Sequence, residues 1–215
     1  MVIESVTASE VTLKSFSGNS EIGKIDSQDA EIGTSSGSTE LGEIRVKTFK
    51  YESFSGYVTI KRLQSEDSDI STSSGKINID DGENVKMKFK TFSGDIRGVK
   101  LGAKETTFES SSGEIKLSGL SGKLKADSFS GDIEIQFDAS PEEITANASS
   151  GKIEINLPAN STFDLNAHSS SGEVNCDFPI VLLDKSDNNE IKGKIGGGEN
   201  KVNVGSFSGD IRITK

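Results

Sequence analysis

Few side chains in this sequence have the types and spacing that enzymatic chemistry requires. Serine is abundant, but a nucleophilic serine needs a neighbouring base, and His168 is the only histidine among the 215 residues. His168 lies at a position of outward parity, where we expect a solvent-facing ring. Cys176 is the only cysteine, so no internal disulfide can form, and its apolar-patterned position predicts a buried structural thiol. The sequence therefore predicts no hydrolytic triad.

Three aspartates give the one pattern that could act on a carbohydrate. Asp95, Asp132 and Asp210 occupy the same place after a recurring Ser-Gly pair, and Arg97 and Arg212 follow two residues later. Polysaccharide-cleaving sites group carboxylates with a cation. An outward column of charges that keeps a sheet surface soluble explains the same pattern and is the favoured interpretation. The three aspartates remain candidate binding residues, and we expect no catalytic residue, metal or cofactor.

Charge and hydropathy exclude several classes of partner. The formal net charge is -10, so the chain lacks the basic stripe that nucleic-acid binding needs. No run approaches the ~18 apolar residues of a membrane span, and the N-terminal MVIESVTASE has no basic segment followed by an apolar run. We therefore expect no transmembrane segment and no signal peptide in this chain. A cytoplasmic location and a piece of a longer envelope protein both stay open.

An internal repeat of about 19 residues organises the whole chain. Copies such as TFSGDI at 91–96 and SFSGDI at 128–133 alternate with SSSGEI at 110–115 and ASSGKI at 148–153. A degenerate copy, EIKGKI at 190–195, fills the one gap of double length. The glycines of the clear copies are Gly18, Gly37, Gly56, Gly75, Gly94, Gly113, Gly131, Gly151, Gly172 and Gly209.

Apolar residues alternate on both sides of each of these glycines. Around Gly94 they stand seven and five residues before it, at Met87 and Phe89, and two residues after it, at Ile96. This period of two predicts strands with one buried face, and the change of parity at Ser-Gly predicts a corner or bulge there. Glycine tolerates the positive φ of such a corner, and serine hydroxyls can bond backbone groups that the corner leaves unpaired.

A unit of about 19 residues cannot bury its own apolar face, so the units must stack. We predict an all-β, single-domain parallel β-solenoid over residues 1–215. Regular repeats fill 1–156, and longer-looped repeats with an irregular cap fill 157–215. An up-and-down meander or barrel is the alternative, although the turn sequences that hairpins favour are sparse. The charges beside the glycines favour a 19-residue rung only weakly over a 38-residue coil.

Phenylalanine and serine alternate two residues before the glycine through eight copies, until the order slips at Ser170. A narrow column that admits a ring only at every second level would explain this, so we predict that Phe54, Phe92 and Phe129 are more than half buried. Their parity opposes that of the buried positions, and an exposed sticky stripe is the alternative. The candidate binding residues are Phe16, Phe54, Phe92, Phe129 and Phe207.

The tail of the chain carries a resemblance to a known family. LPANSTFDL (157–165), SSSGEV (169–174), DFPI (177–180) and GKIGGG (193–198) precede a final SFSGDIRI (206–213). With the recurring Ser-Gly copies, they resemble the bacterial adhesin family of β-solenoid domains, found as C-terminal domains of Lia-like cell-envelope stress proteins. The resemblance spans essentially the whole chain. It implies a right-handed solenoid, a cell-surface or envelope location, a link to envelope stress and the antimicrobial-peptide response, and no catalytic residues.

Together these patterns predict a non-enzymatic binding module of the bacterial cell envelope. Its Ser/Thr-rich face would meet a protein, a cationic peptide or an envelope polymer, and the acidic charge favours cationic partners. The alternative is a structural scaffold that stacks end to end through an open strand edge near residues 2–14. A carbohydrate-active enzyme is the least favoured interpretation.

Overall fold

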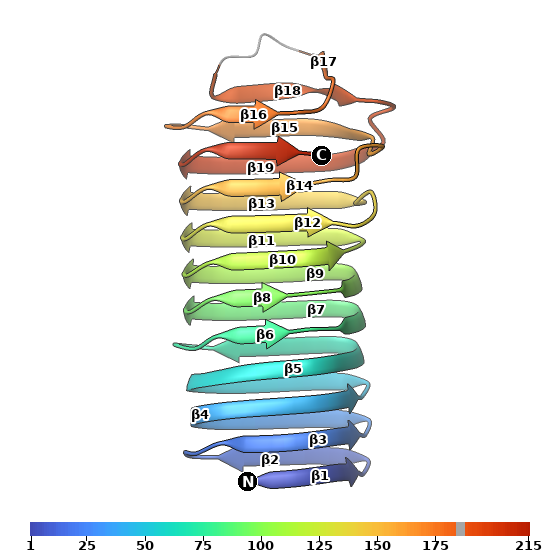
Figure 1. The fold of residues 1–215 in the computed structure, drawn as a ribbon, viewed down its shortest axis with the longest axis vertical. Helices are drawn as coiled ribbons and strands as arrows, with labels where there is room; N and C mark the ends of the chain where they lie inside the picture. The colour runs from blue at the N-terminus through green and yellow to red at the C-terminus, as the bar shows by residue number, and fades with distance from the viewer. Residues whose placement is uncertain (184–187) are drawn as a thin grey trace.

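The computed structural model describes residues 1–183 and 188–215, and within them it contains strands and turns but no helix. The strands stack along one axis into a rod with two long faces (Figure 1). One face consists of β1 (Val2–Thr7), β3 (Ser20–Asp26), β6 (Ile77–Ile79), β8 (Ile96–Gly98), β10 (Ile115–Leu120), β12 (Ile133–Phe137), β14 (Ile153–Asn156), β20 (Ile211–Thr214) and β16 (Val174–Cys176). The other consists of β2 (Glu10–Ser15), β7 (Gly82–Ser93), β9 (Leu101–Ser112), β11 (Lys123–Ser130), β13 (Glu143–Ser150), β19 (Asn200–Ser208), β15 (Phe163–Ser169), β18 (Glu190–Ile195) and β17 (Val181–Leu182). Two long strands, β4 (Asp29–Arg45) and β5 (Thr48–Thr72), contribute to both faces.

Neighbouring rungs pair in parallel and nearly always in a register of one repeat. Asp29 of β4 pairs with Thr48 of β5, and Gly82 of β7 pairs with Leu101 of β9. Equivalent residues of successive copies therefore lie directly above one another, at the ~4.8 Å spacing of a sheet. The predictions of a parallel β-solenoid and of a 19-residue rung are confirmed, and a meander, a barrel or a 38-residue coil does not fit this register.

The core lies between the two faces and is built from the residues of inward parity. Phe89 of β7 and Phe108 of β9 are fully buried, and their rings stack with centroids 4.6 Å apart. Across the core from them, Ile96 and Ile115 are also fully buried. Burial of apolar surface drives folding, and each rung alone is too thin to bury these side chains on both sides. Stacking is therefore what creates the core.

The glycine corner, formed by the ten Ser-Gly glycines, joins the two faces along one edge of the rod. A Cβ placed on Gly94 would overlap the carbonyl oxygen of Gly75 on the preceding rung, and a Cβ on Gly75 would overlap that of Gly56. Some corner glycines also have positive φ, such as Gly37 at 111°. Every corner glycine except Gly18 lies so close to the backbone of a neighbouring rung that a Cβ would overlap it, whereas positive φ occurs at only some of them. The close approach therefore explains the repeated glycine better than φ does.

The C-terminal rung does not occupy the last place in the stack. Strand β19 pairs in parallel with both β13 and β15, and β20 pairs in parallel with both β14 and β16. The chain therefore inserts its final rung between two rungs that precede it in sequence, and the C-terminus lies inside the stack in Figure 1. The register is continuous through the insertion, since Ile144, Val202 and Leu165 pair in turn.

The EIKGKI sequence at 190–195 is not a rung, and the expectation that it is a degenerate copy is wrong. It forms β18, which runs antiparallel to β15, and β17 in turn runs antiparallel to β18. These strands cover the C-terminal end of one face, which confirms the predicted cap. A tight turn at 196–199 returns the chain to β19, with Gly196 and Gly198 at φ values of 59° and 67°.

Candidate interaction surface

The five phenylalanines two residues before the corner point into solvent. The side chain of Phe16 is 84% exposed, and those of Phe54, Phe92, Phe129 and Phe207 are each 69% exposed. The prediction that Phe54, Phe92 and Phe129 are more than half buried is therefore wrong. Strand alternation decides the outcome: the residue before each ring has inward parity, so the ring must point outward.

Small hydroxyl residues fill the inside of the corner in place of the rings. Thr72, Thr91, Ser110, Ser128 and Ser206 are all buried there. The expected bonding of these hydroxyls to the backbone occurs at only some levels. Thr34 Oγ1 donates to the carbonyl of Ser36, and Ser169 Oγ donates to that of Gly209. The corner is narrow because it holds only these short side chains.

The inserted C-terminal rung completes the alternation of phenylalanine and serine. Since Ala148 pairs with Ser206 and Ser169 also pairs with Ser206, Phe207 lies between Ser149 and Ser170. The alternation breaks at Ser170 in the order of the sequence, but it is unbroken in the order of the rungs along the rod. From the N-terminal end, levels one to ten carry Phe16, Ser35, Phe54, Ser73, Phe92, Ser111, Phe129, Ser149, Phe207 and Ser170. We call the five rings the phenylalanine stripe.

Open hollows lie beside the stripe at its serine levels. One of about 430 Å³ is lined by Phe129 together with Ser111 and Ser149, the serines of the levels below and above it. A second, of about 480 Å³, is lined in the same way by Phe54 with Ser35 and Ser73. Rings of the stripe are about 9–10 Å apart, twice the strand spacing. The edge of the rod is therefore a regular series of rings and gaps.

The three candidate aspartates stand just past the corner and serve its backbone. Oδ1 of Asp95 accepts the backbone N–H of Glu114, 3.2 Å away, and Oδ1 of Asp132 accepts that of Lys152 at 2.8 Å. Asp210 accepts the N–H of Glu173 at 3.0 Å. Each carboxylate thus bonds the amide of the next rung, which gives the column a structural role.

One of these aspartates also pairs with a lysine on the rung below it. Lys76 Nζ lies 2.7 Å from Asp95 Oδ2. Its hydrogen bond lowers the pKa of Asp95, and the same contact raises the pKa of Lys76. The pair is largely exposed to solvent, so it adds little to stability. Both partners are charged at neutral pH, and the pKa of Asp95 is shifted in the direction opposite to the one that a carboxyl acting as a general acid requires.

Among the residues that the structure describes, the side chains considered as catalytic candidates lie far apart or are partly buried. His168 is exposed on the tenth level, as expected from its parity. Residues 33–37 spell Gly-Thr-Ser-Ser-Gly, the letters of a hydrolase nucleophile turn, but Ser35 lies within strand β4 on the second level. Eight levels, roughly 38 Å, separate it from the histidine. Cys176 is partly buried, and burial raises the pKa of its thiol, which disfavours a reactive thiolate.

Among residues 1–183 and 188–215, no group of three or more His, Cys, Asp or Glu side chains could hold a metal ion. In that described part of the chain, no helix has the length and apolar character to cross a membrane.

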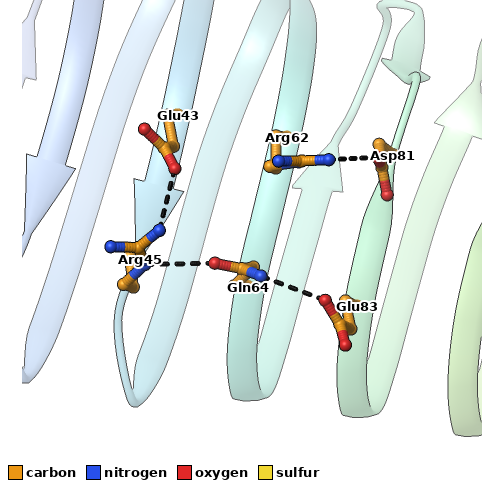
Figure 2. Close-up of polar contacts among 6 residues, drawn as sticks. All are labelled: Glu43, Arg45, Arg62, Gln64, Asp81 and Glu83. Carbon is orange, nitrogen blue, oxygen red and sulfur yellow. Dashed lines mark hydrogen bonds and ion pairs between the residues drawn. The ribbon is translucent and has the colours of Figure 1, made fainter.

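A second set of polar contacts joins neighbouring rungs on the surface of the rod, away from the glycine corner. Figure 2 shows surface side chains from three neighbouring rungs: Glu43, Arg45, Arg62, Gln64, Asp81 and Glu83. Arg45 Nε donates to Gln64 Oε1 at 3.1 Å, and Gln64 Nε2 donates to Glu83 Oε2 at 3.0 Å. Arg62 pairs with an Asp81 oxygen at 3.0 Å. These groups bond one another, so they hold the rungs in register and do not form an open site.

Comparison with known proteins agrees with this geometry. The sequence matches the family model described as Toastrack DUF4097 twice, over residues 3–100 and 84–214. Together the two matches cover nearly the whole chain. No curated protein and no solved structure matches it.

Proposed function

The chain belongs to the Toastrack family of β-solenoid-like domains, and we propose that it is a non-enzymatic interaction module whose contact surface is the phenylalanine stripe. The observation that carries this proposal is the exposure of five aligned rings, each at least 69% accessible. Exposed large apolar side chains that gather on one part of a soluble protein mark sites of interaction, and here five of them are aligned along one edge. The hollows beside these rings are open to solvent and do not enclose a ligand, which suits a protein partner better than a small molecule.

The solenoid explains how such a surface can stay available. The rings lie outside a core that is complete without them, so the fold does not depend on covering them. The corner backbone that carries them is fixed by stacked glycines on every rung. A contact surface on a rigid scaffold loses little conformational entropy when it binds. The stripe is therefore prepared for binding before a partner arrives.

The experiment compares the wild type with a variant carrying Phe54→Ser, Phe92→Ser and Phe129→Ser. The probe is the hydrophobic dye bis-ANS, followed by fluorescence titration. We expect the variant to lose most of the dye binding while its melting temperature stays within about 2 °C of the wild type. A matched control replaces Val181, Leu182 and Leu183, an exposed apolar cluster at the cap, with serine. Unchanged dye binding in the stripe variant would contradict the proposal.

We also propose a setting at the cell envelope. This rests on the resemblance of the repeats and tail to adhesin-type envelope domains, including those of Lia-like stress proteins. The acidic net charge of -10 supports attraction of cationic peptides in that setting. Fractionation of the source cell with an antibody to this domain tests the location. Recovery only with soluble cytoplasmic markers would overturn it.

The open N-terminal end supports a second candidate, a scaffold that joins through its ends. Among residues 1–183 and 188–215, β1 pairs with β3 and β2 pairs with β4, and neither strand has a partner on its other edge. Free edges can accept another strand. The opposite end is covered on one face by the antiparallel strand β18, which disfavours an endless head-to-tail filament. Ile3→Pro in β1 would weaken such end pairing and leave the phenylalanine stripe intact.

A further inference from the structure

We propose that the partner of the phenylalanine stripe is a second copy of this chain, in an antiparallel two-fold dimer whose rings enter the serine levels of the other copy. This inference rests on the proposed function, because it assigns an occupant to the same surface. It adds the partner, the relative direction of the two rods and their register. Four features of the surface support it: its period, its number of levels, its area and its flanking charges.

The period of the stripe matches another solenoid better than it matches other elements. Its rings repeat every two rungs, about 9.6 Å. An α-helix repeats a face at seven residues, about 10.5 Å, and an extended strand repeats a face at about 6.8 Å. Over the four intervals from Phe16 to Phe207, a helix would drift by about 4 Å, which is close to one rung. A second copy has the same period and does not drift.

The number of levels makes the antiparallel arrangement fit along its full length. A two-fold axis that runs between the two rods, perpendicular to both and at the height midway between levels five and six, places level one against level ten, and level two against level nine. Because the ten levels begin with Phe16 and end with Ser170, each ring then faces a serine level of the partner. At the centre, Phe92 faces Ser111. The hollows beside Phe54 and Phe129 show the room that the incoming rings would occupy.

Parallel rods would not fit in this way. A two-fold axis along the rods places equal levels together, so that each ring meets the same ring of the other copy. The two stripes would then hold the rods apart and leave every serine level empty. On all ten levels the residue directly before the corner glycine is a serine, whose small side chain permits the two rods to approach closely in the interdigitated arrangement. These residues are Ser17, Ser36, Ser55, Ser74, Ser93, Ser112, Ser130, Ser150, Ser208 and Ser171.

The exposed area is close to what a stable dimer needs. A phenylalanine side chain can bury roughly 150–250 Å². At the exposures given above, the five rings offer roughly 540–900 Å² on each copy. A standard protein interface buries about 800 Å² on each partner. The stripe and its flanking serines therefore supply enough surface for a dimer without any change of the fold.

The charges beside the rings suit the same arrangement. The column two residues before the rings carries Lys90 on level five and Glu109 on level six. In one chain Lys90 Nζ lies 3.3 Å from Glu109 Oε2. The antiparallel axis would place Lys90 opposite Glu109 of the other copy, and the reverse, so that four alternating charges meet at the centre. Farther out, the same rule places Glu52 opposite Asn147 and Ser71 opposite Asp127, so no like charges face each other in these pairs.

The first experiment is sedimentation velocity of the full chain across a concentration series from 1 to about 300 µM. We expect a monomer–dimer equilibrium that Phe92→Ser weakens by about 30-fold or more, as for a central anchor residue. Ser111→Phe is the decisive variant, because it adds an apolar ring but fills the level that Phe92 of the partner would enter. We expect it to weaken the dimer at least tenfold. Stronger association in this variant would overturn the interdigitated fit.

The second experiment determines direction by cysteine cross-linking in a Cys176→Ser background. Ser36 lies on level two and Ser208 on level nine, so the antiparallel dimer brings them together across the interface. A mixture of the Ser36→Cys and Ser208→Cys proteins should form a mixed disulfide on mild oxidation. Each protein alone should form little, because its own cysteines would lie seven levels, about 34 Å, apart. Disulfides within each single variant would show a parallel arrangement and overturn the proposal.

The outcomes separate this inference from the proposed function. If the wild type stays monomeric to 300 µM, the second copy is not the partner. The stripe would still be the contact surface if bis-ANS binding depends on Phe54, Phe92 and Phe129. If the dye binds equally without these rings, both proposals fail.

Discussion

Phe89 and Phe92 lie three residues apart on strand β7, but one side chain is buried and the other is exposed. Phe89 is fully buried and stacks on Phe108 of the next rung, whereas Phe92 is 69% exposed at the glycine corner. Both belong to columns that follow the rod, one inside and one outside. Residue type therefore does not decide burial here. Position relative to the corner does, because alternation along the strand assigns each residue to one face.

The comparison also shows what each column contributes. The inner rings stack ring on ring and fill the space between the faces, so their contribution is to stability. The outer rings have serine above and below them and pack on little else. They are available as a contact surface because the fold gains almost nothing from them. The following substitutions test this division, from the largest expected effect to the smallest.

The largest effect should come from Gly94→Ala, which attacks the corner that separates the two columns. Its Cβ would overlap the carbonyl oxygen of Gly75, and stacked backbone on both sides prevents relaxation. We expect a loss of more than about 4 kcal/mol in the free energy of unfolding, measured by urea denaturation. Gly197→Ala is the matched control, since its Cβ would meet only Glu199 at an ordinary 3.9 Å. A loss below 1 kcal/mol at Gly94 would show that the corner can relax.

Phe89→Ala should be next, because it empties a fully buried ring site. We expect a loss of about 3–4 kcal/mol, the usual cost of removing such a ring. The loss should appear in the same urea transition, with no effect on the binding of bis-ANS. A stability close to that of the wild type would mean that the inner stack is not what holds these rungs together.

High pH should destabilise the core through Tyr51, which belongs to the same inner column as Phe89, since each lies five residues before its corner glycine. Burial raises the pKa of Tyr51, while the bond from its hydroxyl to Thr39 Oγ1 opposes the shift. The stabilising contribution is therefore complete below pH 10 and is lost as the pH rises from 10 through the folded-state pKa. The expected slope is up to about 1.4 kcal/mol per pH unit. Tyr51→Phe should remove this part of the alkaline dependence, and an unchanged profile would contradict the assignment.

The smallest effect is expected for Phe92→Ala. Its ring is mostly exposed, so the free energy of unfolding should change by no more than about 0.5 kcal/mol at a concentration where the chain is monomeric. The contrast with Phe89→Ala is the sharpest test of the two columns. If Phe92→Ala cost 3 kcal/mol or more, the outer ring would be part of the core after all.

Sequence alone determined much of this architecture. The repeat of about 19 residues, the alternation around Ser-Gly and the recurring glycine predicted stacked strands with a corner, because these features depend on local geometry. The parity of Phe92 also pointed outward, but a packing explanation for the alternation led to the opposite prediction. The aspartates were assigned correctly to one column. Their bonds to the next rung were missed, since no sequence pattern shows which amide lies opposite.

The order of the rungs was decided only by the tertiary structure. All copies present similar edges, so the sequence of β19 could pair with several neighbours at similar energy, and the repeat itself cannot choose among them. The cap strand β18 runs antiparallel to β15, and the tight turn after it returns the chain so that β19 lies between β13 and β15. That insertion sets Phe207 between Ser149 and Ser170 and completes the stripe. The local periodicity of the sequence determined the conformation of each rung, and long-range packing determined the position of the last rung in the stack.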